Sequence, residues 1–241
     1  MTISMNRLAV ISDIHGNYPA LKAVLEDIDK SNVNEIFCLG DVVGYYCQVN
    51  ECIDSIRERG IRCLLGNHDY YMISGACCES KTVKMCIDYQ STIIRKDNLE
   101  WLKSLKPDFD TDEISFRHGG WSDAIEQRIK VFDFNWVKDF PQRLFFSGHT
   151  HIQGVQKDEL RGKVYCNPGS VGQPRDDKPS AAYAIIGPEG KIELRRVDYD
   201  IDEIVNKMKE ANLGEWIWKG LYTGEKVGGN EKHIKKQMGL F

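Results

Sequence analysis

Short apolar runs alternate with amphipathic segments along the amino half of the chain. The runs at residues 8–12, 35–39 and 61–65 have the length of buried β-strands. Residues 20–28 and 49–59 place apolar side chains at helical spacing, and the first of these sets is Ala20, Leu21, Val24, Leu25 and Ile28. The repetition of strand, helix and strand predicts parallel strands and an α/β layered fold.

The second half of the chain contains more strands than helices. Residues 70–106 are predicted to be mostly helical, with a helix at 81–96. A surface connection is predicted from Pro107 and the acidic stretch at 108–113. Strands are predicted at 113–117, 144–147, 163–166, 181–186 and 191–197, with a turn at 187–190 that makes the last two an antiparallel hairpin. A helix at 202–212 follows. We expect one domain of residues 1–222, including the helical segment at about 70–106, and a loosely ordered tail of residues 223–241.

Composition and charge narrow the class of protein. Of the 241 residues, 41% are hydrophobic and 28% are charged, which is sufficient for a buried core. The formal net charge is −4 and no basic run exceeds two residues, so we expect no binding to a nucleic-acid duplex. Apolar runs fall short of the roughly 18 residues that span a bilayer, and the amino end does not resemble a signal peptide. We expect a cytoplasmic protein without a membrane partner, and the sequence leaves the oligomeric state open.

The cysteines do not form a recognisable metal or disulfide framework. None of the eight is part of a C-x-x-C pair, which excludes a zinc ribbon by spacing. Cys38 and Cys63 lie in apolar runs and are interpreted as small core residues. A redox role for the adjacent Cys77 and Cys78 stays open.

Five short polar clusters each follow a predicted strand, and together they contain five of the six histidines. The clusters are Asp13-Ile14-His15-Gly16, Gly40-Asp41, Gly66-Asn67-His68-Asp69, His118-Gly119-Gly120 and Gly148-His149-Thr150-His151. Taken singly, each has a structural explanation, such as a helix cap at Asp13 or a turn at Asp41. Loops at the carboxyl ends of strands converge in α/β sheets, so the clusters are expected to meet. An extended backbone would point the rings of His149 and His151 the same way.

The residue types indicate metal binding. Imidazole nitrogens, carboxylates and an amide oxygen suit manganese, iron, zinc or cobalt. Seven candidate ligands exceed the need of one tetrahedral ion and fit two divalent ions that share a bridging carboxylate: Asp13, His15, Asp41, Asn67, His118, His149 and His151. Two such ions would leave net positive charge at the site, which would attract an anion such as phosphate.

The ordered motifs D-x-H, G-D, G-N-H-D, H-G and G-H-x-H resemble those of the calcineurin-like metallophosphoesterases, and Asn167-Pro168-Gly169-Ser170 is similar to the turn that follows in that family. The segment at 42–46 and the loop at 169–175 look most like the small stand-alone prokaryotic members, which are similar to diadenosine tetraphosphatase. The resemblance implies an α/β fold of two packed mixed β-sheets flanked by helices, a four-layer αββα sandwich. It also implies hydrolysis of phosphate ester or phosphoanhydride bonds in a nucleotide-like or small phosphorylated substrate.

The resemblance also implies residue roles. Asp13, His15 and His151 would hold one metal ion, Asp41 would bridge, and a second ion would be held by Asn67, His118 and His149. The non-ligand His68 would lie over the substrate and serve the leaving group. Asp69 is given no role, because a side chain adjacent to His68 in sequence can point away from it. Candidate substrate contacts are Arg175 and Tyr45.

Departures from the family pattern bear on the activity. Some branches carry G-D-x-x-D-R-G, but here Gly44 and Tyr45 replace the Asp that orients the catalytic histidine and the Arg that binds phosphate. This argues against a serine/threonine protein phosphatase, which stays an alternative beside a non-catalytic metal-binding scaffold. The presence of His68 favours hydrolysis.

Overall fold

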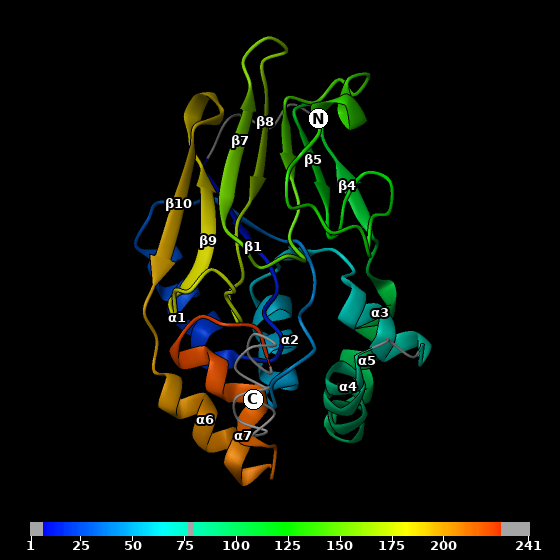
Figure 1. Ribbon diagram of the computed structural model, residues 1–241, viewed down its shortest axis with the longest axis vertical. Helices are drawn as coiled ribbons and strands as arrows, with labels where there is room; N and C mark the ends of the chain where they lie inside the picture. Colours follow the sequence, from blue (N-terminus) through cyan, green and yellow to red (C-terminus); the bar gives the residue numbers. More distant parts are fainter. Residues whose placement is uncertain (1–6, 77–79, 228–241) are drawn as a thin grey trace, which may run out of the picture.

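The computed structural model describes residues 7–76 and 80–227, and two mixed β-sheets form its centre (Figure 1). The first sheet has the order β10-β9-β1-β2-β3, with parallel pairing among β1, β2 and β3 and antiparallel pairing at β9. Its strands are β1 (Leu8–Ile11), β2 (Glu35–Cys38), β3 (Arg62–Cys63), β9 (Ala181–Ile186) and β10 (Ile192–Val197).

The second sheet has the order β4-β5-β6-β8-β7, and its central strands β5, β6 and β8 are parallel. The edge strands β4 and β7 pair antiparallel with β5 and β8. Its strands are β4 (Asp108–Asp110), β5 (Ile114–Arg117), β6 (Leu144–Phe146), β7 (Gly154–Asp158) and β8 (Lys163–Asn167). The parallel β5 and β6 therefore both end beside the polar clusters of this half of the chain.

Helices gather below the strands in the view of Figure 1. The α-helices there are α1 (Tyr18–Asp29), α2 (Val49–Glu58), α3 (Asn67–Ser74), α4 (Lys81–Ile93), α5 (Lys96–Ser104), α6 (Ile201–Glu210) and α7 (Glu215–Trp218). The described chain also contains the 3-10 helices η1 (Phe134–Val137), η2 (Pro188–Gly190) and η3 (Lys219–Tyr222). Side-chain caps define several starts: Asn17 accepts from the Ala20 N–H at 3.3 Å, and Asp200 accepts from the Glu203 N–H at 3.2 Å.

Alternation along the strands supplies both faces of the first sheet with core residues. In β1, Leu8 and Val10 pack between the sheets, whereas Ala9 and Ile11 face the helices. The second sheet contributes residues such as Phe116, whose ring stacks on Phe37 with centroids 4.1 Å apart. Because both faces of β1 are buried, its sequence is a continuous apolar run rather than an alternating one.

The outer face of the second sheet is covered by the segment 119–143, which contains η1. Phe145 and Tyr165 from the sheet pack there against Ile129, Phe132 and Val137. The Phe132 and Tyr165 rings stack with centroids 4.3 Å apart. This layer is therefore aromatic packing under an irregular segment with one short helix.

The predicted α/β fold of two mixed sheets flanked by helices is confirmed, and so is the antiparallel hairpin of β9 and β10. The helix predicted at 81–96 is wrong at its end. It stops at Ile93, because Ile94 and Arg95 have extended backbone, and a separate helix starts at Lys96.

The surface connection predicted at 108–113 is wrong for residues 108–110, which form β4. Phe109 packs against the intersheet core while its neighbours Asp108 and Asp110 point outward, and Asp110 accepts from Arg117 Nη1 at 2.8 Å. The strand β7 lies outside the predicted set. Both are edge strands whose side chains are only partly buried, so neither has a long apolar run.

Other expectations concern the cysteines and the end of the chain. Cys38 and Cys63 are buried, as predicted, whereas Cys77 and Cys78 lie outside the described residues. Val227 packs into the helix-side core, and residues 228–241 lie outside the described part. Among the described helices, none has the length and apolar character needed to cross a membrane. The single-domain assignment stays a prediction.

Candidate metal centre

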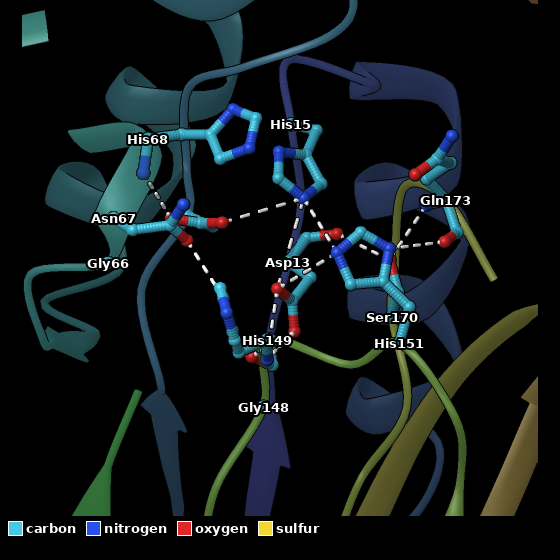
Figure 2. A network of polar contacts seen from close by, with 12 residues as sticks. Asp13, His15, Gly66, Asn67, His68, Gly148, His149, His151, Ser170 and Gln173 are labelled. Carbon is cyan, nitrogen blue, oxygen red and sulfur yellow. Dashed lines mark hydrogen bonds and ion pairs between the residues drawn. The ribbon is translucent and has the colours of Figure 1, made fainter. Parts of the chain in front are cut away.

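The polar clusters that follow five strands meet at one place. Figure 2 shows His15, Asn67, His149 and His151 around Asp13, although they come from both sheets. The two sheets are joined here by direct contacts, since the His149 N–H donates to Asp13 Oδ2 at 3.0 Å and His118 Nδ1 donates to the Leu39 carbonyl at 3.0 Å. The convergence expected from the strand ends is therefore present.

The loops reach this centre with strained backbone. Nine non-glycine residues of the described chain have positive φ, and five of them are candidate ligands: Asp13, His15, Asp41, His149 and His151, with φ between 55° and 63°. Each such residue costs on the order of 1–3 kcal/mol, so the surrounding fold must hold it in place. Such clustering of backbone strain is typical of functional sites.

The extended H-x-H arrangement predicted at 149–151 is wrong. Both histidines have a φ of 63°, so the backbone is left-handed at each and the rings separate. His149 lies beside Asn67, with its Nδ1 2.9 Å from Asn67 Oδ1, whereas His151 lies beside His15. Gly148 precedes them because a Cβ there would be 2.0 Å from Ser12 Oγ and 2.6 Å from Asp13 Oδ2.

The first group of candidate ligands consists of Asp13, His15 and His151, all buried. His15 Nδ1 donates to the Val43 carbonyl at 3.1 Å, and His151 Nδ1 donates to the Gln173 carbonyl at 2.6 Å. Each ring therefore presents an Nε2 lone pair, and the two Nε2 atoms are 3.1 Å apart. The Nε2 of His151 is also 3.2 Å from Asp13 Oδ1. Two facing lone pairs beside a carboxylate repel one another unless a cation lies among them, so these donors fit a divalent ion.

The second group consists of Asn67, His118 and His149. His118 Nδ1 donates to the Leu39 carbonyl, and its other ring nitrogen, Nε2, lies 3.1 Å from Asn67 Oδ1. His149 Nε2 is buried and has no hydrogen-bond partner in the described structure. An amide oxygen between two imidazoles, with one orphaned ring nitrogen, is a second donor set that could hold a cation.

Asp41 lies between the two groups. Its Oδ2 is 3.7 Å from His15 Nε2 and 3.4 Å from His118 Nε2, while its Oδ1 accepts the His68 backbone N–H at 2.8 Å. One carboxylate oxygen thus faces both donor sets, which is the position that a bridging ligand needs.

Burial and charge shift the ionisation of these groups in opposite directions. Burial is the main cause that lowers the pKa of His149 to about 2 and the pKa of His68 to about 4, so both rings are neutral at pH 7. Burial also acts on His118, but the charges of Asp41 and Asp13 outweigh it and raise its pKa to about 10. A protonated His118 therefore balances the negative charge of Asp41.

Asp69, which received no role from the sequence, holds two of the site loops together. Its carboxylate accepts four backbone N–H groups at 2.8 to 3.1 Å, those of Asp41, Val42, Val43 and Gly66. Burial and the Asp41 charge raise its pKa to about 7, although the N–H donors act against this. The sequence signal is its place three residues after Gly66, at the start of α3, where an acidic side chain caps a helix.

The two candidate substrate contacts adjoin the centre. The Tyr45 ring packs on those of His15 and His68, with centroids 4.8 and 4.9 Å away. Arg175 Nη2 donates to the Tyr45 hydroxyl at 3.0 Å, and its backbone N–H donates to the His151 carbonyl at 3.2 Å. Both residues thus lie on the side of the centre formed by His15, His68 and His151.

Comparisons with known proteins identify the family of this chain. Residues 6–190 match the model of the "Calcineurin-like phosphoesterase superfamily domain". The chain is 36% identical over 238 residues to the uncharacterized protein MJ0912 of Methanocaldococcus jannaschii, covering 90% of this chain and 98% of that one.

Two solved structures are similar over almost their whole length. A metallophosphoesterase from Sphaerobacter thermophilus has 29% identity and a TM-score of 0.80, covering 91% of this chain and 99% of that one. Hypothetical protein PH1004 from Pyrococcus horikoshii OT3 has 21% identity, the same coverage and a TM-score of 0.79, which shows a shared fold. With the family model matched from the first strand through the hairpin turn, the chain belongs to the calcineurin-like phosphoesterase superfamily.

Proposed function

We propose that this protein is a phosphohydrolase with a dinuclear metal centre, acting on phosphate ester or phosphoanhydride bonds of a small phosphorylated or nucleotide-like substrate. The observation that carries the proposal is the pair of Nε2 atoms of His15 and His151, 3.1 Å apart and facing Asp13. Such an arrangement costs free energy in the protein alone and becomes favourable around a cation. Membership of the superfamily supports the reaction class.

The two donor sets give each ion its ligands. Asp13, His15 and His151 would hold one, Asn67, His118 and His149 the other, and Asp41 Oδ2 faces both. This mixture of nitrogen and oxygen donors favours manganese, iron, zinc or cobalt over magnesium or calcium. Bound divalent ions would supply Lewis-acid chemistry, lowering the pKa of a coordinated water towards about 7 and neutralising phosphoryl oxygens.

His68 is the residue proposed to serve the leaving group. Its backbone N–H is fixed on Asp41 Oδ1, and its ring lies against that of His15, with centroids 4.6 Å apart, so it adjoins the metal centre. Burial lowers its pKa to about 4, and an anionic substrate would favour the protonated ring. The protonated imidazole would then donate to the departing oxygen.

Arg175 and Tyr45 are proposed to contact the substrate. Burial is the main cause that lowers the pKa values of His15, His68 and His151, and the positive charge of the nearby Arg175 guanidinium lowers them further. A guanidinium in this place would favour a phosphate group and could take over from the arginine that is missing at position 45.

Gly44 weighs against protein-phosphatase chemistry of the G-D-x-x-D-R-G kind. A Cβ at this position would be 2.2 Å from His15 Nδ1 and 2.8 Å from His68 Nδ1. No carboxylate could stand here without moving both rings, so His68 must be oriented in another way.

Removal of metal tests the proposal. Chelator-treated protein should lose activity on bis(p-nitrophenyl) phosphate and p-nitrophenyl phosphate, because Asp13, His15 and His151 cannot polarise a phosphoryl group alone. Manganese should restore activity as elemental analysis rises to about two ions per chain. Undiminished turnover after verified metal removal would refute the proposal.

Metal affinity should rise with pH. His118 has a pKa raised to about 10, so it holds a proton at neutral pH that a metal at Nε2 must displace, whereas His149, with its pKa lowered to about 2, has none to lose. Manganese binding at pH 6, below the pKa of about 7 expected for a metal-bound water, should therefore release about one proton per chain, and affinity should gain at least about tenfold per pH unit from pH 6 to 9. Titration calorimetry in buffers of different ionisation enthalpy measures this release; binding without it would contradict ligation by His118.

Replacing the Asp69 carboxylate should damage the metal centre. In Asp69→Asn an NH₂ group faces backbone N–H donors, so the Asp41 and Gly66 loops lose their common anchor. We expect metal affinity and kcat to fall about 10- to 100-fold. The control is Asp133→Asn, which changes an exposed carboxylate that accepts the Asn135 N–H at 2.9 Å in η1. Equal metal affinity in the two variants would show that Asp69 does not support the centre.

A further inference from the structure

In the described part of the chain, no hydrogen bond to Nδ1 orients the ring of His68. The ring is buried, and its Nδ1 has no hydrogen-bond partner among the described residues. Its position is set by packing instead: the His15 and Tyr45 ring centroids lie 4.6 and 4.9 Å away, and that of Tyr71 lies 5.9 Å away. Gly44 completes the enclosure, because its backbone lies where a Cβ would approach His68 Nδ1 to 2.8 Å.

Two of these walls belong to one short loop, the segment 43–46. His15 fixes its ends, since His15 Nδ1 donates to the Val43 carbonyl at 3.1 Å and the Tyr46 N–H donates to the His15 carbonyl at 2.8 Å. The centre of the loop, which carries the Gly44 and Tyr45 walls, needs a separate support.

Gln90 of α4 supplies that support. Its Oε1 accepts the Gly44 N–H at 2.9 Å, and its Nε2 donates to the Tyr46 carbonyl. The side chain is fully buried, so water does not compete for these groups. The two bonds bracket Tyr45, and they come from the helical segment rather than from a strand-end motif.

The chemistry at this position demands an amide. One side-chain end must accept from an N–H and donate to a carbonyl at once, which a carboxylate or an apolar side chain cannot do. A flipped amide would set donor against donor and acceptor against acceptor, so the orientation of Gln90 is fixed by its two partners.

We propose that Gln90 is a positioning residue for His68, which acts by holding the Gly44–Tyr46 loop as the wall against which the imidazole packs. The leaving-group part of this inference rests on the proposed function. The helical segment thereby takes over the orienting task that a carboxylate on the imidazole would otherwise perform.

The test compares Gln90→Met with Gln142→Met in the full chain. Methionine keeps length and volume but removes both polar contacts. Gln142 is the matched control because it is also a buried glutamine, and its Nε2 donates to the Thr111 carbonyl at 2.9 Å. Gln90→Glu is the second variant, since it keeps an acceptor for the Gly44 N–H but can donate to the Tyr46 carbonyl only when its carboxyl is protonated.

Two readouts separate positioning from stability. In metal-free protein, the ring signal of His68 in a ¹³C-histidine NMR spectrum, assigned with His68→Ala, should shift in Gln90→Met and stay unchanged in Gln142→Met. In manganese-loaded protein of equal metal content, Gln90→Met should lower kcat for phenyl phosphate by roughly tenfold more than for p-nitrophenyl phosphate, because the poorer leaving group depends more on an acid. Gln90→Glu should fall between wild type and Gln90→Met.

The outcomes distinguish this inference from the proposed function. An unshifted His68 signal in folded Gln90→Met, or equal effects of Gln90→Met and Gln142→Met on the ratio of the two kcat values, overturns the role of Gln90. If His68→Ala itself leaves that ratio unchanged, the acid role of His68 fails. The NMR comparison then still decides whether Gln90 positions the ring.

Discussion

The structure depends on holding several buried polar groups close to one another at the junction of the two sheets. Facing imidazole lone pairs, two carboxylates and an orphaned His149 Nε2 are all removed from water at the junction of the two sheets. Desolvation of such groups costs several kcal/mol unless a partner compensates. Five left-handed backbone residues add to this cost. The apolar packing on both faces of β1 is what keeps the loops in place, because a softer framework would relax and let the donors separate.

Two supports of different origin act on this framework. Asp69 ties the loops after β2 and β3 together through four backbone N–H groups, so the carboxylate works as a cross-link between strand ends. Gln90 reaches the same region from α4 with a neutral amide. A neutral side chain has an advantage here, because another full charge beside His15 and His68 would alter the electrostatics of both rings.

The sequence predicted the parts of the molecule that have a strong local signal. The buried strands are continuous apolar runs, and α1 has apolar residues at helical spacing, so periodicity was sufficient for both. The edge strands β4 and β7 were missed because half-exposed strands resemble connections. The candidate ligands were found from strand-end motifs, but the left-handed backbone at His149 and His151 depends on contacts with Asp13 and Gln173 that only the assembled sheets supply. Gln90 had no signal at all, because its partners are backbone groups of a loop more than forty residues away in sequence.

The same reasoning indicates where substrate selection must reside. A pair of divalent ions would act on monoesters, diesters and anhydrides alike, so the donor sets by themselves would not choose among them. Gly44 and Tyr45 stand where the G-D-x-x-D-R-G pattern has Asp and Arg, and both lie against His15. Arg175, from another loop, donates to the Tyr45 hydroxyl on the same side of the centre. Tyr45 packs on the rings of His15 and His68, and its hydroxyl accepts a hydrogen bond from the Arg175 guanidinium. A substitution of either Tyr45 or Arg175 would therefore change both the shape and the charge on this side of the centre. Selectivity for a substrate is therefore expected to follow the Tyr45 and Arg175 pair rather than the metal ligands.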